Sequence, residues 1–145
     1  MPDKAKELNT SVKLINNKLH FTGTAGSNAP VSIDYIAPLG DDLGYTSLEL
    51  LLLSLSSCVG SAVLTFLRRM NRTVNGCEIN SKGLRREEHP TGFSHITIDI
   101  TIHSHDVSEA DMKKVLALAE DKYCPVLSMI KGNTEVENLF RILPL

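Results

Sequence analysis

An unbroken run of eighteen uncharged residues, Leu50 to Leu67, constrains this chain more than any other feature. Thr46 and Glu49 precede it in the pattern of a capping box, in which side-chain oxygens accept hydrogen bonds from free backbone N–H groups. Arg68 and Arg69 follow it, where positive charge stabilises the C-terminus of a helix. The run therefore predicts one long helix. Its first three turns are apolar or small on every side, which is typical of a buried helix.

A membrane span is the alternative interpretation of the same run. Eighteen residues reach the lower limit of the length that crosses a bilayer. Four serines, a threonine and a glycine interrupt the apolar character, and strand-like and helical segments surround the run. The sequence therefore favours the buried core helix of a globular domain.

Composition limits the class of protein and of partner. A chain of 145 residues is expected to form one domain, residues 1–145, with residues 1–10 as a loose tail. A net charge of −2 indicates neither a nucleic-acid partner nor an acidic membrane surface. The polar start MPDKAKELNT lacks the apolar core of a secretory signal, and three cysteines do not suggest a secreted disulfide framework. We therefore expect a cytoplasmic protein with reduced thiols.

The remaining pattern predicts an α+β fold, in which strands pair mainly as hairpins and helices cover one face. Residues 93–105 give the clearest strand, because isoleucines alternate there with polar residues. Ser108 and Asp111 form a second capping signature. In chain order we predict strands over 11–16, 18–23 and 31–37, the long helix, strands over 73–89 and 93–105, helices over 108–123 and 125–130, and a strand over 134–143.

Cys124 is the first candidate for chemistry. Pro125 suits the first position of a helix, because its missing N–H would have no partner there. Cys124 is then the N-cap, and free backbone N–H groups near its sulfur would lower the thiol pKa and favour the thiolate. The alternative is a small apolar residue at a helix junction, and position alone does not decide between the two.

Cys58 lies about three turns inside the long helix, too far in to gain much from the helix dipole. Taken alone, a buried helical cysteine behaves as a small hydrophobic residue. Cys58 and Cys124 together, however, could form a pair in which one thiol attacks the substrate and the other resolves the product. We interpret Cys77 as a structural bystander, because no cationic residue lies on its side of the predicted strand.

The histidines near residue 100 are candidates for a metal site. His95, His103 and His105 share a predicted strand face with Asp99, and the spacing of His103 and His105 is typical of ligands. No cysteine or carboxylate cluster elsewhere completes the set, and a polar strand face is normally solvated. We therefore predict no metal site.

Two segments resemble a known family. The run SLELLLLSLSSC, followed by apolar residues and LRRM, resembles the central helix of the OsmC/Ohr proteins, the osmotically induced and organic hydroperoxide resistance proteins. The segment DKYCPVLSMIKGNTEV is similar to the family's second cysteine segment, where Cys-Pro opens a short helix. The likeness, including the order of elements, extends from Ser11 to Leu143.

This resemblance implies a fold, an activity and a pair of site residues. Family members form intertwined homodimers with the long helix at the interface, and the peroxidase members reduce organic hydroperoxides. By resemblance Cys58 is the peroxidatic thiol, which becomes a sulfenic acid, and Cys124 is the resolving thiol that condenses with it to a disulfide. A lipoyl-type dithiol such as dihydrolipoamide would restore both thiols. No metal or organic cofactor is implied.

The chain departs from the peroxidase pattern in its charges. Peroxidase members carry an early-strand Arg that steadies the thiolate, whereas no Arg precedes Arg68 here. Lys13, Lys18 and His20 are candidates to replace its charge, although an ammonium lacks the planar fork of a guanidinium.

The family's glutamate partner of that Arg is also replaced. Leu48 occupies its position, ten residues before the cysteine, and Glu49 lies about 180° around the helix from Cys58. The sequence thus leaves two hypotheses. The first is a Cys58–Cys124 peroxidase, and the second is a dimer that binds a small hydrophobic ligand or senses oxidation without catalysis.

Overall fold

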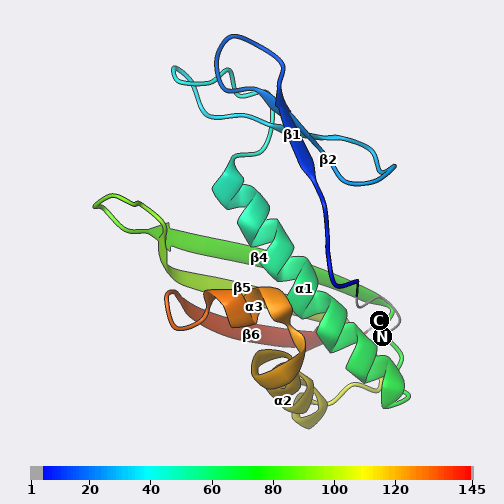
Figure 1. Cartoon of the computed structure of the whole chain (residues 1–145). Helices are drawn as coiled ribbons and strands as arrows, with labels where there is room; N and C mark the ends of the chain where they lie inside the picture. The colour runs from blue at the N-terminus through cyan, green and yellow to red at the C-terminus, as the bar shows by residue number, and fades with distance from the viewer. Residues whose placement is uncertain (1–4, 145) are drawn as a thin grey trace. The chain divides into compact units, whose positions relative to one another are not determined.

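The computed structural model describes residues 5–144, and its order of elements is the predicted α+β order (Figure 1). The elements are β1 (Ser11–Leu14), β2 (Phe21–Thr24), β3 (Val31–Ile33), α1 (Ser47–Arg69), β4 (Gly76–Arg85), β5 (Phe93–His103), α2 (Glu109–Leu118), the π-helix η1 (Ala119–Tyr123), α3 (Pro125–Ile130) and β6 (Glu135–Leu143). Residues 5–10 of the predicted tail form no helix or strand, and residues 1–4 lie outside the described part.

Backbone contacts divide the chain into two compact units, one up to Leu50 and one from Leu51 onwards. The first unit holds an antiparallel sheet in the order β1-β2-β3, in which β1 and β2 form the predicted hairpin. Asp34, which follows β3, is buried, and its carboxylate accepts hydrogen bonds from the backbone N–H groups of Tyr35, Asp41 and Leu43. Burial raises the pKa of Asp34, but these three bonds outweigh it and hold the pKa below its usual value.

The capping box that the sequence predicts starts α1. The Thr46 backbone N–H and hydroxyl both donate to Glu49 Oε1, at 2.9 and 3.0 Å, and the Glu49 N–H donates to Thr46 Oγ1 at 3.2 Å. Glu49 therefore satisfies the helix start, and the carboxylate that comes closest in sequence to the family's glutamate is committed to this cap.

The second unit is built on a sheet in the order β4-β5-β6. The long hairpin of β4 and β5 is antiparallel, as predicted, whereas β6 pairs with β5 in parallel. The inner face of β5 is fully buried; it carries Ile96, Ile98, Ile100 and Ile102. Figure 1 shows α1, α2 and α3 on one face of this sheet. The alternation of isoleucines with polar residues in the sequence therefore correctly identifies which side chains of β5 lie in the core.

Helix α1 packs on this sheet through a glycine. A Cβ at Gly60 would lie 2.6 Å from Ile79 Cδ1 of β4, so the absent side chain lets helix and strand approach closely. One face of α1 is buried, but Leu53 is 51% exposed, and Ser57 and Ser61 are exposed as well. The prediction of a helix buried on every side is therefore wrong for the single chain, because helices and sheet of the same unit cover only one side of it.

By length and composition alone, α1 is long and apolar enough to cross a membrane, a test that core helices of globular proteins also pass. The packing of Gly60 against Ile79 favours the core helix over the membrane span as the interpretation of the uncharged run.

The helix predicted over residues 108–123 has two parts. Ser108 and Asp111 form the predicted capping box at the start of α2. After Leu118 the chain widens into the π-helix η1, in which the Cys124 N–H donates to the carbonyl of Ala119, five residues earlier, at 3.0 Å. Capping residues predict where a helix starts, but the switch to a π-helix depends on how the segment before Cys124 docks on its neighbours.

Candidate functional site

Cys124 occupies the position that the sequence predicts for it. It is the N-cap of α3, with Pro125 as the first helical residue, and its Sγ accepts a hydrogen bond from the Leu127 N–H at 3.4 Å. The residue is only 2% exposed. The sulfur is thus held at a helix start and shielded from water.

The structure brings Cys58 and Cys124 together. Cys58, half-buried in the middle of α1, lies close enough to Cys124 for its side chain to raise the pKa of the Cys124 thiol. The two residues are 66 positions apart in sequence and come from different helices. Both are free thiols. The two thiols are candidates for one disulfide between α1 and the start of α3.

Of the two interpretations of Cys124, the thiol with a lowered pKa is the one that the structure does not support. Burial, followed by the neighbouring Cys58 side chain, raises the pKa of Cys124 to about 12, against an ordinary value of 9.0. Hydrogen bonds from the backbone N–H groups of Leu127 and Val126 act in the opposite direction, as expected at a helix start, but are outweighed. Cys124 is therefore a protonated thiol at neutral pH.

Two of the candidate replacements for the family's arginine are bound within the first unit. Lys18 Nζ lies 2.8 Å from Asp41 Oδ1, and His20 Nε2 shares a 2.8 Å hydrogen bond with Ser32 Oγ. The strongest influences on the Cys124 pKa are burial, Cys58 and backbone N–H groups, with no cation among them.

Cys77 differs from its prediction in one respect. Burial raises the pKa of its thiol, and the positive charge of Arg68 opposes this, so a cationic side chain does lie nearby. The prediction that no cation lies on its side is wrong, because the end of α1 brings Arg68 toward β4. Cys77 lies opposite Ile102 on the face of the sheet that the helices cover, and it is exposed.

The histidines form no metal cluster: among residues 5–144 no group of three His, Cys, Asp or Glu side chains could hold a metal ion. His95 lies instead between two glutamates of β6, with Nδ1 3.7 Å from Glu135 Oε2 and Nε2 3.7 Å from Glu137 Oε1. His105 lies beyond the end of β5. These contacts tie β5 to its parallel neighbour.

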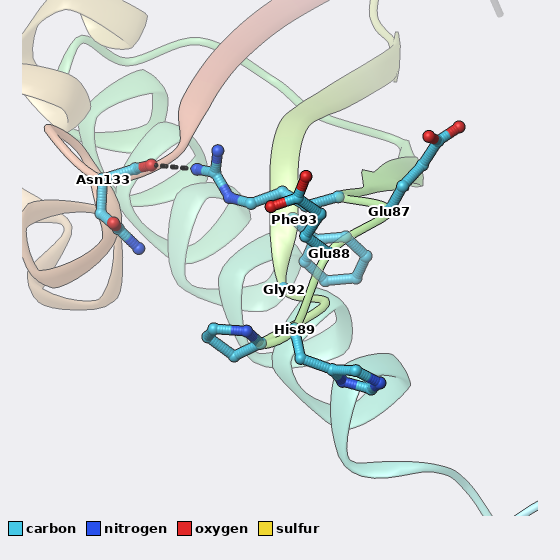
Figure 2. Close-up of a pocket in the computed structure, with 8 residues that line it drawn as sticks. Glu87, Glu88, His89, Gly92, Phe93 and Asn133 are labelled. Carbon is cyan, nitrogen blue, oxygen red and sulfur yellow. Dashed lines mark hydrogen bonds between the residues drawn. The ribbon is translucent and has the colours of Figure 1, made fainter.

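An open hollow of about 650 Å³ lies at the tip of the β4–β5 hairpin (Figure 2). It is lined by Arg86, Glu87, Glu88, His89, Pro90, Gly92, Phe93 and Asn133. Arg86 Nη2 donates to the Asn133 carbonyl at 2.7 Å, which closes one side of it. Its lining contains no cysteine and mixes both signs of charge, so we assign it no part in the thiol chemistry.

Comparison with known families gives a match to OsmC-like proteins over residues 40–138, which include both Cys58 and Cys124. The chain belongs to the OsmC-like protein family. The resemblance seen in the two cysteine segments is thereby confirmed.

Relatives of this OsmC-like protein include Protein YhfA of Escherichia coli, 24% identical over 125 residues that cover 86% of this chain and 91% of YhfA. A solved structure of a hypothetical protein from Aquifex aeolicus is similar with a TM-score of 0.84 and 27% identity, covering 96% of this chain and 98% of that one. An organic hydroperoxide resistance protein from Elizabethkingia anophelis has the same fold, with a TM-score of 0.75 and 15% identity over 98% of this chain and 99% of that one.

Three residues around α3 of this OsmC-like protein are not predicted from the sequence. Glu120, Lys131 and Asn138 are linked by hydrogen bonds just before and after α3. Pro125 indicates in the sequence that an upstream backbone carbonyl lacks its usual helical donor, because proline has no N–H. Which side chain donates to that carbonyl instead depends on tertiary contacts and cannot be predicted from the sequence.

Proposed function

We propose that this OsmC-like protein is a thiol-dependent peroxidase that reduces organic hydroperoxides. The observation that supports this most directly is the proximity of Cys58 to Cys124, which raises the pKa of the Cys124 thiol. A peroxidase that works through a disulfide needs a second thiol within reach of the first. The names of several structurally similar proteins, which are organic hydroperoxide resistance proteins, point to the same substrate class.

The difference in burial suggests the order of the two thiols. Cys58 is half-buried and can be reached by a peroxide, whereas Cys124 is 2% exposed and protonated at neutral pH. The Cys58 thiolate attacks one peroxide oxygen, the O–O bond breaks, and the alkoxide leaves with a proton as an alcohol. Cys58 is then a sulfenic acid.

Cys124 completes the oxidative half of the cycle. Its sulfur attacks the Cys58 sulfur, a disulfide forms, and the sulfenic oxygen leaves as water with the Cys124 proton. A dithiol of the lipoyl class then reduces the disulfide by two exchange steps and becomes a cyclic disulfide itself. The scheme uses no metal or organic cofactor, and it suits the reducing conditions of the cytoplasm, where we place the protein.

We further propose that the working form is a homodimer. Between Leu50 and Leu67 the exposed face of α1 carries no charge, and Leu53 projects from it at 51% exposure. Strands β1 and β3 expose apolar side chains as well, among them Val12 at 58% and Val31 at 40%. Uncharged surface of this kind is typical of a protein interface, and a second copy of this chain supplies a matching uncharged face.

The peroxidase proposal is tested by the consumption of cumene hydroperoxide and of hydrogen peroxide, with dihydrolipoamide as the reductant. Wild type, Cys58→Ser and Cys124→Ser are compared at equal concentration of folded protein. We expect turnover that prefers the organic peroxide, is lost in Cys58→Ser, and stops after about one equivalent in Cys124→Ser. The absence of turnover in folded, reduced wild type would refute the proposal.

A second function is favoured by two observations. No cation is among the strongest influences on the Cys124 thiol, and Leu48 occupies the family's glutamate position. A thiol pair without an activating charge suits a dimer that binds a small hydrophobic ligand or registers oxidation slowly. Slow disulfide formation without peroxide turnover would select this function.

A further inference from the structure

The segment that leads into Cys124 is tied down at one residue, Glu120, by two hydrogen bonds. Lys131 Nζ donates to the Glu120 carbonyl oxygen at 2.8 Å, and Asn138 Nδ2 donates to Glu120 Oε1 at 2.7 Å. Glu120 lies four residues before Cys124, Lys131 caps the C-terminus of α3, and Asn138 lies on β6. The C-terminal end of the short helix that Cys124 begins is therefore tied to Glu120, and Glu120 is tied to β6.

The bond from Lys131 follows from the π-helix and the proline. In η1 the carbonyl of Ala119 accepts from the N–H of Cys124, five residues on. The next carbonyl, that of Glu120, would accept from residue 125 in the same pattern, but Pro125 has no N–H to donate. The Lys131 ammonium takes the place of that donor. The lysine thus completes a helical turn that the Cys-Pro pair leaves open.

The bond from Asn138 comes from an unusual place for an amide. Asn138 alternates with Val136 and Phe140 on the less exposed face of β6, opposite Ile98 of β5. Its Oδ1 is buried and has no hydrogen-bond partner within the described residues, which costs free energy that an aliphatic side chain would avoid. The hydrogen bond from the Asn138 amide to Glu120 is therefore the interaction that offsets the cost of placing an amide at this position.

An aromatic contact holds the other end of the segment. The ring of Tyr123, the residue before Cys124, packs on Phe66 of α1 with centroids 4.8 Å apart and planes tilted by 59°. Phe66 lies eight residues, about two helical turns, after Cys58 on the same helix. The segment from Glu120 to Tyr123 is thus fixed both to the sheet and to the helix that carries the other thiol.

We propose that Lys131 and Asn138 are positioning residues, which hold Glu120 so that the Cys124 sulfur stays against Cys58. This inference rests on the proposed function, since it concerns how readily the same two thiols form their disulfide. Freeing Glu120 lets the start of α3 move away from α1. The effective concentration of one thiol at the other then falls, although neither thiol is changed chemically.

The test measures the thiol–disulfide equilibrium directly and uses no peroxide. Protein with the Cys77→Ser background is equilibrated in buffers of reduced and oxidised glutathione, so that two protein thiols and one oxidised glutathione give the Cys58–Cys124 disulfide and two reduced glutathiones. Alkylation and mass measurement give the fraction oxidised. We expect Lys131→Met and Asn138→Ala each to lower the equilibrium constant by about tenfold, the effect of losing one hydrogen bond.

Conservative variants separate positioning from general loss of stability. Lys131→Arg keeps a donor and Glu120→Gln keeps an acceptor for Asn138, so both are expected to stay within about threefold of wild type. Ser104→Ala, which removes a buried hydroxyl that donates to the Thr73 carbonyl at the far end of β5, should lower the melting temperature without changing the equilibrium constant. Because Lys131 is exposed, Lys131→Met is expected to remain folded.

Two results would overturn the positioning proposal. One is an unchanged equilibrium constant in folded Lys131→Met and Asn138→Ala, and the other is a wild type that forms no disulfide in any glutathione buffer. A wild type that forms the disulfide but consumes no hydroperoxide would remove the peroxidase function and leave the positioning role in place.

Discussion

The Cys58 side chain lies near enough to Cys124 to be, after burial, the largest cause of the raised pKa of that thiol. The pair therefore consists of a half-buried thiol on a long helix and a shielded thiol at the start of a short one. Two neighbouring thiols resist the loss of the second proton, because the first thiolate disfavours another negative charge beside it.

Removal of Cys58 is expected to lower the pKa of Cys124. In Cys58→Ala, with Cys77→Ser so that one thiol remains, the Cys124 pKa should fall below its value of about 12 yet stay above 9.0, since burial is the larger cause and persists. The rate of alkylation by iodoacetamide as a function of pH measures it. A Cys124 pKa that stays at about 12 or rises in this variant would show that Cys58 does not act on Cys124.

Gly60 and Ile79 are expected to be energetically coupled. Alanine favours a helix over glycine by about 1 kcal/mol, but in wild type the added Cβ would lie 2.6 Å from Ile79 Cδ1 and much of that gain is lost. In an Ile79→Val background the Cδ1 is absent, so Gly60→Ala should stabilise by close to the full amount.

Urea unfolding of the four proteins in this cycle gives the coupling free energy. Ile79→Val alone should cost at most about 1 kcal/mol, because Ile79 is only half-buried. Equal effects of Gly60→Ala in both backgrounds would mean that α1 and β4 do not approach as closely as the structure has them.

Arg72 and Asp111 are expected to make stability sensitive to acid. Arg72 Nε donates to Asp111 Oδ2 at 2.7 Å, and this bond, with those from Ser108, lowers the pKa of Asp111 from 3.8 to about 2. A carboxyl whose pKa is depressed in the folded state stabilises the fold above pH 3.8, and that contribution is lost as pH falls toward 2.

In Arg72→Ala the Asp111 pKa should therefore return most of the way to 3.8, as followed by carbon NMR of its carboxyl. The stability difference between wild type and variant should be constant above pH 5 and shrink toward pH 2. Lys113→Ala, which breaks an exposed pair with Glu109, is the control and should leave the acid profile unchanged. If Asp111 in Arg72→Ala titrates as it does in wild type, Arg72 is not the cause of its lowered pKa.

The proposed dimer predicts a difference between two equally exposed leucines. Leu53 on α1 is 51% exposed and Leu84, on the outer face of the β4–β5–β6 sheet, is 50% exposed. Leu53→Lys should raise the dimer Kd by at least about thirtyfold, the loss of a central interface contact, while Leu84→Lys should not change it. Light scattering after gel filtration measures both, and a dimer that withstands Leu53→Lys would place the interface elsewhere.

The sequence by itself determined the features that depend on neighbouring residues. The capping boxes at Thr46 and Ser108, the helix start at Cys124 and the alternating isoleucines of β5 are all present as predicted. Each is set by backbone hydrogen bonding or side-chain direction within a few residues, and such rules act before any long-range contact forms.

Tertiary structure decided what depends on distance and burial. The helix dipole predicts a lowered pKa at Cys124, but the interior of the unit and the approach of Cys58 raise it instead, because desolvation of a thiolate outweighs two backbone hydrogen bonds. The exposed side of α1 and the ties from Lys131 and Asn138 to Glu120 depend in the same way on residues far apart in the chain. Periodicity places a side chain on a face of its own element, but only the packed chain determines what that face meets.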